Sequence, residues 1–168
     1  MASSDSAELH FERSLDDAYD ALERRLRAGP EAWLPGFSVE AGKVTCELWF
    51  EQAGRRISRR VELEAGPVQR FAYGVTVHVR WKAARHPELY PAFDGHLRLE
   101  ARRQAGSMLR LDGRYTPPGG RLGATVDRAV MHHVAQSSVN DLLARVAERL
   151  VTSPARDAPN AGPPASSR

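Results

Sequence analysis

The sequence predicts an α+β domain in which a curved antiparallel sheet wraps around a long C-terminal helix, with one or two short helices after the first strand. Three observations predict this fold. Apolar and polar residues alternate with a period of two over most of residues 39–115, which is typical of an antiparallel sheet with one buried face. No helical segment separates these runs, which argues against parallel βαβ units. A helical segment at 121–151 follows, and placing it across the sheet is the remaining way to bury the apolar face.

The composition is typical of a single globular domain. The chain has 168 residues, of which 42% are hydrophobic and 27% are charged. We expect residues 8–152 to form a ligand-binding domain. Residues 1–7 and 153–168 have little apolar surface to bury, so we expect both segments to be disordered. The N-terminus lacks the features of a signal peptide and no window resembles a membrane span, so we expect a cytoplasmic protein without integral membrane association.

The N-terminal part predicts a strand followed by short helices. The strand is expected at residues 8–13. Ser14, with Asp17 three positions later, resembles a capping box and predicts a helix that begins immediately after the strand. Glycine and proline at 29–30 end this helix, and residues 31–34 are expected to add one more turn.

Five alternating runs predict the strands of the sheet, and short turns between them predict a meander of neighbouring strands. One parity of each run is apolar and is expected to face the core, whereas the opposite parity carries charges of both signs. His78 and His96 share this polar face, where they are expected to approach each other across strands. The predicted inner positions are Val44, Cys46, Leu48 and Phe50; Ile57, Arg59, Val61 and Leu63; Phe71, Tyr73, Val75, Val77, Val79 and Trp81; Leu97, Leu99 and Ala101; and Leu109, Leu111, Gly113 and Tyr115.

The C-terminal helix leaves two interpretations open. Pro117-Pro118 ends the last strand, and glycines then lead into the helix. The apolar residues of 126–134 and those of 142–150 point to different sides of an ideal helix. Either the helix bends at Ser137-Ser138 or it is covered on two sides. A strongly twisted sheet need not close on a helix along its whole length, so we expect an apolar cavity at the wide end of the sheet.

Three segments resemble the START-like superfamily, also called SRPBCC, which includes the birch-pollen-allergen fold and bacterial polyketide cyclases. They are Trp81, the Pro91–Gly95 segment as a turn, and the passage from Gly113 to Asp127, which is similar to G-x-Y-x-P-P-x-G-x-x-G-x-x-x-D in many bacterial members. The element order extends the resemblance over residues 8–151. It implies a helix-grip fold with a hydrophobic pocket between the sheet and the last helix. Superfamily members bind lipids, sterols, polyketides or plant hormones, and some are cyclases, dehydratases or hydrolases, so the fold alone does not choose a function.

Arg59 is the most informative candidate for ligand binding. Its parity places it on the apolar face, where an unpaired guanidinium costs several kcal/mol. A carboxylate, phosphate or enolate of a ligand would supply a partner in a bidentate fork. Two structural alternatives stay open, namely a bulge that shifts the register and a side chain that reaches solvent near a strand end.

Other inward-facing or helical residues are candidates for the same site. Tyr73, Trp81 and Tyr115 share the inward parity, and a buried phenol needs a hydrogen-bond partner that a ligand can supply. The structural alternatives are a core position for Trp81 and a role for Tyr115 in bracing the turn that follows it. His133 is a candidate acid or base in the cavity, although it and the adjacent His132 point in different directions.

Several classes of site are not expected. Cys46 is the only cysteine, which excludes an internal disulfide and a multi-cysteine metal cage, and its apolar neighbours predict an inert thiol. The histidines lack a third ligand at a zinc-binding spacing, and no cofactor-binding motif is present, so we expect neither metal nor cofactor. A net charge of +3 does not demand a nucleic-acid partner, and we expect none.

These features predict a protein that binds a small hydrophobic or amphiphilic ligand, such as a lipid, an isoprenoid or a polyketide-like molecule. The alternative is an enzyme of the polyketide cyclase/aromatase type that uses Arg59, Tyr73 and His133 to position and protonate an enolate. A third alternative is a protein-interaction module. Trp49 has outward parity, and an exposed tryptophan there is able to support a homodimer.

Overall fold

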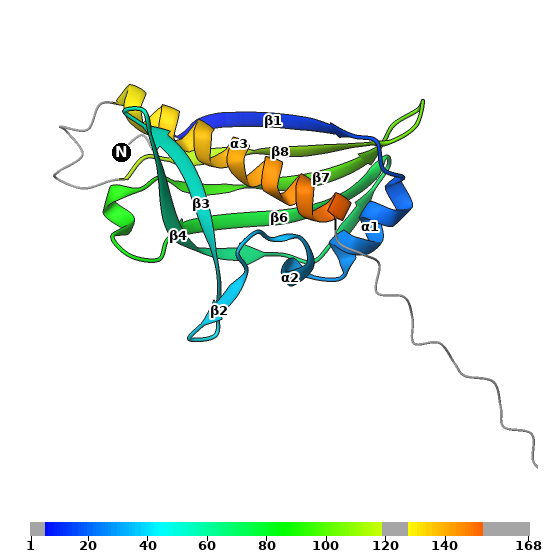
Figure 1. The fold of residues 1–168 in the computed structure, drawn as a ribbon, viewed down its shortest axis with the longest axis horizontal. Helices are drawn as coiled ribbons and strands as arrows, with labels where there is room; N and C mark the ends of the chain where they lie inside the picture. The colour runs from blue at the N-terminus through cyan, green and yellow to red at the C-terminus, as the bar shows by residue number, and fades with distance from the viewer. Residues whose placement is uncertain (1–5, 119–127, 153–168) are drawn as a thin grey trace, which may run out of the picture.

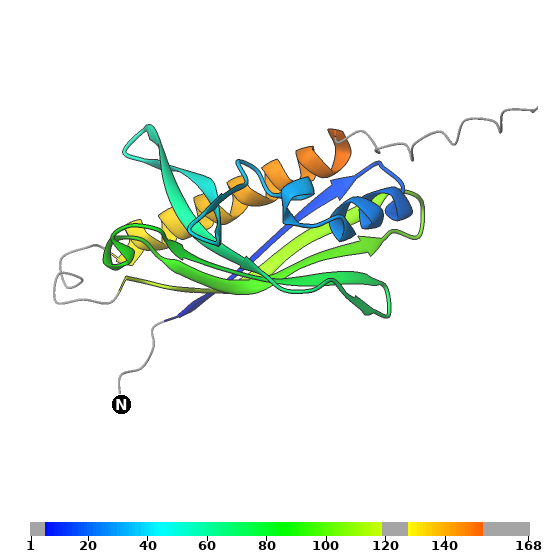
Figure 2. The ribbon, with the colours of Figure 1, turned by 90° about the horizontal axis from the view of Figure 1, so that it is seen from below.

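The computed structural model of the chain describes residues 6–118 and 128–152. An antiparallel sheet of eight strands curves around the long helix α3, and the short helices α1 and α2 cover one end (Figure 1, Figure 2). The strands are β1 (Ala7–Leu15), β2 (Ser38–Glu40), β3 (Lys43–Gln52), β4 (Arg55–Ala65), β5 (Gln69–Phe71), β6 (Gly74–Ala83), β7 (Ala92–Ala101) and β8 (Ser107–Thr116). The helices are α1 (Tyr19–Arg27), α2 (Pro30–Trp33), the 3-10 helix η1 (Pro87–Leu89) and α3 (Arg128–Thr152).

The order of strands confirms the predicted meander. The sheet runs β1-β8-β7-β6-β4-β3-β2, with β5 paired to β6, and every pairing is antiparallel. Ala7, expected in a disordered N-terminus, is the first residue of β1. The other residues expected to be disordered, except Ser6, lie outside the described part, as do the start of the predicted helix at 121 and the glycines before it.

The predicted capping box at Ser14 is wrong. β1 continues through Leu15, which pairs with Ser107 of β8. The N-cap of α1 is Ala18, which makes no side-chain capping bond. The long β1–β8 ladder satisfies more backbone groups than an earlier helix start would, because each further strand residue is paired in register with β8.

α3 covers the edge of β3 as well as the inner face of the sheet. Beyond its short pairing with β2, β3 has one free edge, whose backbone groups need partners. Three side chains spaced four residues apart on α3 supply them. The bonds are Glu51 N–H to Ser137 Oγ at 3.1 Å, Trp49 N–H to Asp141 Oδ2 at 3.3 Å, and Arg145 Nη1 to Glu47 O at 2.8 Å.

The spacing of these side chains along α3 matches the spacing of the backbone groups along β3. Four residues of a helix advance by about 6 Å, and two residues of a strand advance by about 6.6 Å. Side chains at every fourth helical position therefore meet every second residue of a strand that runs nearly alongside. The helix replaces a neighbouring strand over this part of β3.

The described part of α3 is covered on two sides, as one of the two interpretations required. It packs against β3, β1 and β8 of the sheet and also contacts α1 and α2. The guanidinium of Arg25 on α1 donates hydrogen bonds to the carbonyls of Leu150 and Val151, which satisfies the end of the helix. In the described part of the chain, no helix is both long and apolar enough to span a bilayer.

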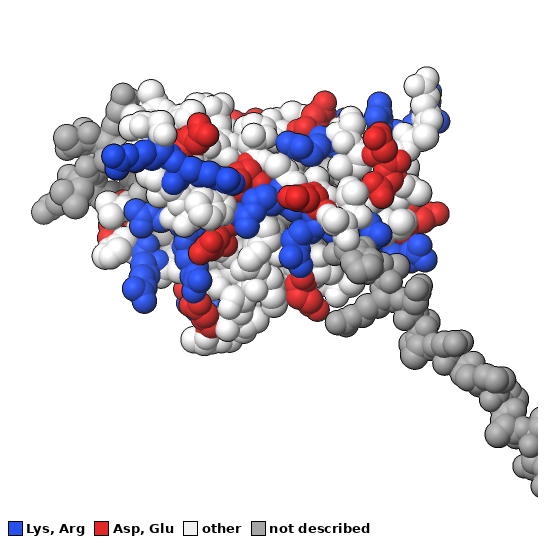
Figure 3. Space-filling view, viewed as in Figure 1, with Lys and Arg blue, Asp and Glu red and all other residues white. Residues whose placement is uncertain are grey.

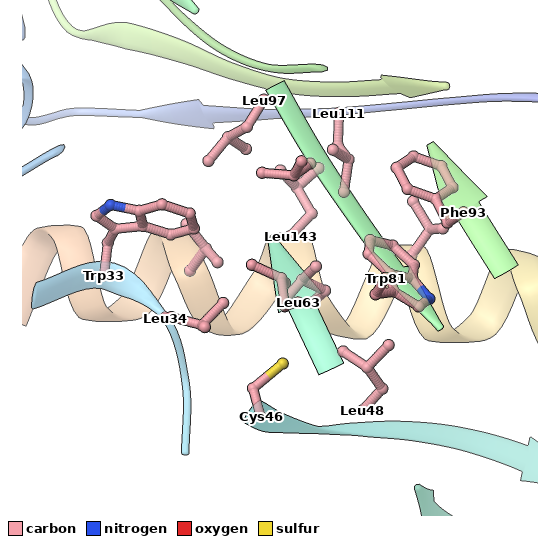
Figure 4. Close-up of a cluster of buried hydrophobic side chains, with 14 of the residues drawn as sticks. Trp33, Leu34, Cys46, Leu48, Leu63, Trp81, Phe93, Leu97, Leu111 and Leu143 are labelled. Atoms are coloured by element: carbon pink, nitrogen blue, oxygen red, sulfur yellow. The ribbon is translucent and has the colours of Figure 1, made fainter. Parts of the chain in front are cut away.

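The core lies between the inner face of the sheet and α3. Figure 4 shows part of it, with leucines from β3, β4, β7 and β8 facing Leu143 of the helix. Cys46 is buried among them, and burial raises the pKa of its thiol to about 12. The thiol is therefore protonated at neutral pH, which agrees with the inert role predicted for it.

The Asp141 carboxylate is expected to be the most important of the three edge contacts, because it also pairs with Arg56 at 3.2 Å and Arg145 at 3.4 Å. We expect Asp141→Ala to lower the free energy of unfolding by about 1–3 kcal/mol, since it leaves the Trp49 N–H without an acceptor. Urea denaturation measures this change. Asp141→Asn keeps an acceptor oxygen and should lose less, whereas Asn140→Ala, on the exposed side, should stay within about 0.5 kcal/mol. An Asp141→Ala protein as stable as the wild type would contradict the edge role of α3.

Candidate ligand-binding site

Four aromatic side chains face α3 at one end of the sheet. Trp81 comes from the end of β6, Phe93 from the start of β7, Tyr115 from the end of β8, and Tyr90 from the segment after η1. All four are buried, and they surround a small cavity against the helix. Figure 4 shows two of them, Trp81 and Phe93, close together beside the helix. We call this group the aromatic end. The remaining lining residues of its cavity are Pro91, Ala92, Ala135 and Val139.

A pair of glycines makes room for Phe93. Gly95 and Gly113 are partners across β7 and β8, and a Cβ on either would lie within 2.7 Å of the tip of the Phe93 ring. The ring thus occupies the space that two side chains would fill, and it stacks on Trp81 at 4.2 Å with an interplanar angle of 17°. The predicted turn at 91–95 is therefore wrong, because β7 begins at Ala92 and its pairing with β8 runs through both glycines.

Two hydroxyl groups supply the polar part of the aromatic end. The Tyr115 hydroxyl lies 3.0 Å from Nδ1 of His132, and burial raises the pKa of this tyrosine. The Tyr90 hydroxyl donates to Ser138 Oγ at 2.6 Å, and Ser138 donates to the carbonyl of Val134 at 2.7 Å. Both phenols are protonated at neutral pH, so each is able to donate a hydrogen bond. Both also have a partner within the chain, so neither requires a ligand.

The space between the sheet and α3 is almost filled. The cavity at the aromatic end has a volume of about 10 Å³, and so does a second cavity deeper in the core, beside Trp33 and Leu143. Each is at most large enough for one water molecule, whereas sites for small organic ligands measure about 300–1,000 Å³. The expectation of an open apolar cavity is therefore wrong for the described residues. Alternation shows which side chains face inward, but not how closely the sheet and helix approach each other.

Comparison with solved structures identifies the fold of the chain. No protein-family model matches the sequence, and no curated protein matches it either. Among solved structures, a protein from Thermus thermophilus is 14% identical, with a TM-score of 0.51 over 86% of this chain and 97% of that one. Ara h 8.0201 is 12% identical, with a TM-score of 0.50 over 88% and 99%. Truncated norcoclaurine synthase from Thalictrum flavum is 6% identical, with a TM-score of 0.52 over 92% and 99%. The chain has the helix-grip fold.

The helix-grip fold is the one that the resemblance to the START-like superfamily implied. The similarity extends over most of the chain and of each solved structure, so it concerns the whole arrangement of sheet and helix. At identities of 6–14% it concerns the fold and does not assign a ligand or a reaction to this chain.

The predicted burial of Arg59 is wrong. Its side chain is exposed and lines a surface cleft. β6 ends at Ala83, whose partner on β4 is Val61, so among the described residues no strand pairs with the first half of β4 on that side. A side chain that points inward from this part of β4 therefore reaches solvent. The alternative interpretation, that the side chain reaches water near a strand end, is the correct one.

The predicted inward orientation of Tyr73 is also wrong, because its side chain is 77% exposed. The run that reads as one strand from Phe71 onward is two strands, since β5 turns back on β6 with Phe71 paired to Gly74. Tyr73 lies in this tight turn. At Gly74 a Cβ would lie 2.0 Å from the Leu99 carbonyl oxygen, so the close approach to β7 requires glycine.

Of the helix histidines, His132 and not His133 meets the aromatic end. His133 is exposed, whereas His132 is half-buried against Tyr115. His132 precedes the buried Ala135 by three residues and therefore shares its face. This spacing is visible in the sequence, but it identifies the face only when the buried residues of the helix are known.

Trp81 and Tyr115 have the predicted inward orientation, and the structure brings them together with side chains that the sequence did not single out. Tyr90 lies in an irregular segment without periodicity, and Phe93 lies where a turn was expected. Ser138 sits at a helical position whose face the sequence left open. No sequence pattern marks these three residues as neighbours of one site.

The outer face of the sheet carries the histidines that were considered for a metal site and the tryptophan that was considered for a partner contact. The rings of His78 and His96 lie 5.0 Å apart across β6 and β7, as expected from their parity. Residues 6–118 and 128–152 contain no group of three side chains arranged to hold a metal ion. Trp49 is half-buried, with the Arg56 guanidinium 4.9 Å from its ring, so less of it is free for a partner than expected. The homodimer stays a prediction.

We expect the Phe93 ring to fill most of the space that a ligand would occupy at the aromatic end. We expect Phe93→Ala to lower the free energy of unfolding by about 3–5 kcal/mol. The vacated space adjoins the existing cavity, so indole at millimolar concentration should bind this variant and recover part of the loss in urea denaturation. Phe93→Leu, which keeps most of the volume, should lose less stability and gain nothing from indole. An indole effect absent from Phe93→Ala would show that the region collapses instead of opening.

Proposed function

We propose that this chain binds a small hydrophobic or amphiphilic molecule at the aromatic end, between the sheet and α3. The observation that carries the proposal is the lining itself. Four buried aromatic side chains stand opposite a helix surface of small residues, and two hydroxyls at the same end are able to orient an oxygen atom of a ligand. The glycine pair beneath Phe93 supports the same interpretation. Because neither glycine has a side chain, the sheet leaves room at this point for the Phe93 ring.

Binding at this place requires side chains to move. A cavity of about 10 Å³ does not admit an organic molecule, so the ligand must displace Phe93 or part of α3. The free energy of that displacement is subtracted from the gross affinity, because the open form is a minor state of the free protein. Ligands that refill the vacated space with apolar surface and offer an acceptor to Tyr115 are favoured. Lipids, isoprenoids and aromatic polyketides meet both conditions.

A thermal-shift screen of fatty acids, isoprenoid alcohols and aromatic polyketides tests the proposal, with native mass spectrometry to measure stoichiometry. A ligand at 100 times its Kd should stabilise the chain by about 2.7 kcal/mol. Ala135→Leu fills the cavity at the aromatic end and should abolish this shift. Ala147→Leu makes the same change at another buried position of α3, away from the cavity lining, and should keep it. The proposal fails if no member of the panel binds, or if both leucine variants bind alike.

A second candidate function is catalysis at the same place, as in a polyketide cyclase/aromatase. It is favoured by the contact between the Tyr115 hydroxyl and His132, which places a hydrogen-bond donor next to an imidazole that is able to accept a proton. Norcoclaurine synthase, a solved structure of similar fold, is an enzyme by its name. In this scheme His132 accepts a proton from the carbon next to a carbonyl, and Tyr115 donates a hydrogen bond to the resulting enolate oxygen.

Turnover of a poly-β-keto substrate tests the catalytic candidate. We expect Tyr115→Phe and His132→Gln to lower kcat by about 100-fold or more, because each removes a group that acts on the reacting atoms. His133→Gln, the exposed neighbour, serves as the matched control and should leave kcat unchanged. A wild-type protein without turnover, or three variants with equal rates, removes this candidate and leaves the binding proposal in place.

A further inference from the structure

The outer face of the sheet brings two histidines together. This face lies on the side opposite to α3 and is turned downward in Figure 2. Figure 3 shows the other side of the molecule, with α3 in front, where Lys and Arg side chains lie among Asp and Glu side chains. On the outer face, His78 of β6 and His96 of β7 are direct partners across the two strands, and their rings lie 5.0 Å apart with an interplanar angle of 34°.

The spacing of the two rings suits a metal ion shared between them. Imidazole nitrogens bind Zn²⁺ at about 2.0–2.1 Å, so two nitrogens on the same ion are at most about 4.2 Å apart. Each nitrogen lies on the rim of its ring, so rings with centres 5.0 Å apart are able to bring one nitrogen each within this limit. Both side chains also reach solvent, because His78 is half-buried and His96 is exposed. An ion in solution therefore has access to the pair.

A carboxylate orients one of the two rings. Asp94 Oδ1 accepts a hydrogen bond from Nε2 of His78 at 2.7 Å. In the neutral imidazole this bond keeps the proton on Nε2 and leaves the lone pair of Nδ1 for a metal ion. Histidines that bind metal ions in proteins commonly donate their other N–H to a carboxylate in this way.

Asp94 differs from the other carboxylates on this face. It has an arginine directly opposite on each neighbouring strand, but each arginine pairs with the glutamate on its other side. These pairs are Arg80 with Glu64 and Arg114 with Glu8. Among the described residues of β1, β4, β6, β7 and β8, the other outer-face carboxylates all have a Lys or Arg partner. The negative charge of Asp94 is thus left beside the imidazoles, where it favours a cation.

The charges on the far side of His96 balance each other. Asp112 of β8 is the direct partner of His96, and its Oδ2 lies 3.7 Å from Nη1 of Arg98. Asp112 Oδ1 is hydrogen-bonded to Nδ1 of His10. Both carboxylate oxygens therefore have partners, and Asp94 supplies the negative charge that is available to the histidine pair.

From this geometry we infer that His78 and His96 together bind one divalent transition-metal ion on the outer face of the sheet. Residues 6–118 and 128–152 contain no group of three side chains arranged to hold a metal ion, so water completes the coordination. Imidazole nitrogens favour Cu²⁺, Ni²⁺ and Zn²⁺ over the hard ions Mg²⁺ and Ca²⁺, and Cu²⁺ binds most tightly of these. The ion links β6 to β7 and is separate from the function proposed above, which concerns the inner face.

Calorimetry with Ni²⁺ and Zn²⁺ and electron paramagnetic resonance with Cu²⁺ test the site at neutral pH, on a chain without an affinity tag. One ion should bind per chain, the Cu²⁺ spectrum should show coupling to two nitrogens, and Mg²⁺ should not compete. Ni²⁺ should also raise the melting temperature, because the two histidines are neighbours only in the folded sheet. The inference is overturned if none of the three ions binds, or if Mg²⁺ displaces the bound ion, which would indicate carboxylate ligands.

Histidine variants locate the ion. His78→Gln and His96→Gln should each weaken Ni²⁺ binding by about tenfold or more, because a single imidazole loses the advantage of a second ligand held nearby. The double variant His86→Gln/His133→Gln removes two exposed histidines that lie outside the strands and should leave binding unchanged. Equal losses in the two sets of variants would show that surface histidines bind the ion without a defined site and would overturn the inference.

A carboxylate variant tests the role of Asp94. Asp94→Asn removes the charge beside His78 and should weaken Ni²⁺ binding by about tenfold. Glu100→Gln makes the same change of charge on the same strand, at a residue that pairs with Arg110 at 3.3 Å, and should have little effect. Wild-type affinity in Asp94→Asn would overturn the role of this carboxylate. Binding of hydrophobic ligands should be the same in all of these variants, so the two proposals fail independently.

Discussion

The fold depends on α3 satisfying two surfaces of the sheet at once. The inner face needs apolar cover, and the free edge of β3 needs hydrogen-bond partners. A helix whose buried residues form one stripe meets only the first need. α3 meets both, because Val139, Leu143 and Val146 turn to the core while Asp141 and Arg145 turn to the β3 backbone. The buried residues from Val134 to Leu150 recur at spacings of three and four, and the side chains that bind the β3 edge form a second row beside them.

Fixing the helix against the β3 edge also determines the interior. With α3 held between the two sides of the curved sheet, the inward side chains of β6, β7 and β8 meet it directly and fill the space. The aromatic end is the place where this packing is least uniform, since large rings there oppose small helix residues and one ring rests on a glycine pair. Helix-grip architecture therefore supplies a location for a ligand, and the side chains decide how much of it is open.

The outer surface has a different organisation. Charged residues of opposite sign pair across neighbouring strands, as Lys43 does with Glu62 and Arg80 with Glu64. Such pairs use up most of the charge on the sheet and contribute little stability individually. Part of β4 has no second strand beside it in the described part of the chain, because β6 pairs with β4 only from Val61 onward.

The periodicity of the sequence determined the architecture, since a period of two over residues 39–115 and a terminal helical segment leave few ways to bury one apolar face. It also placed Trp81 and Tyr115 on the inner face. Tertiary structure decided the site: Arg59 is exposed because β6 stops at Ala83, Tyr73 because β5 turns back, and His132 replaces His133 because of how α3 is rotated. Alternation is a local property that gives the side of the sheet, whereas cavity volume and exposure depend on strand ends and on the distance between elements far apart in the chain.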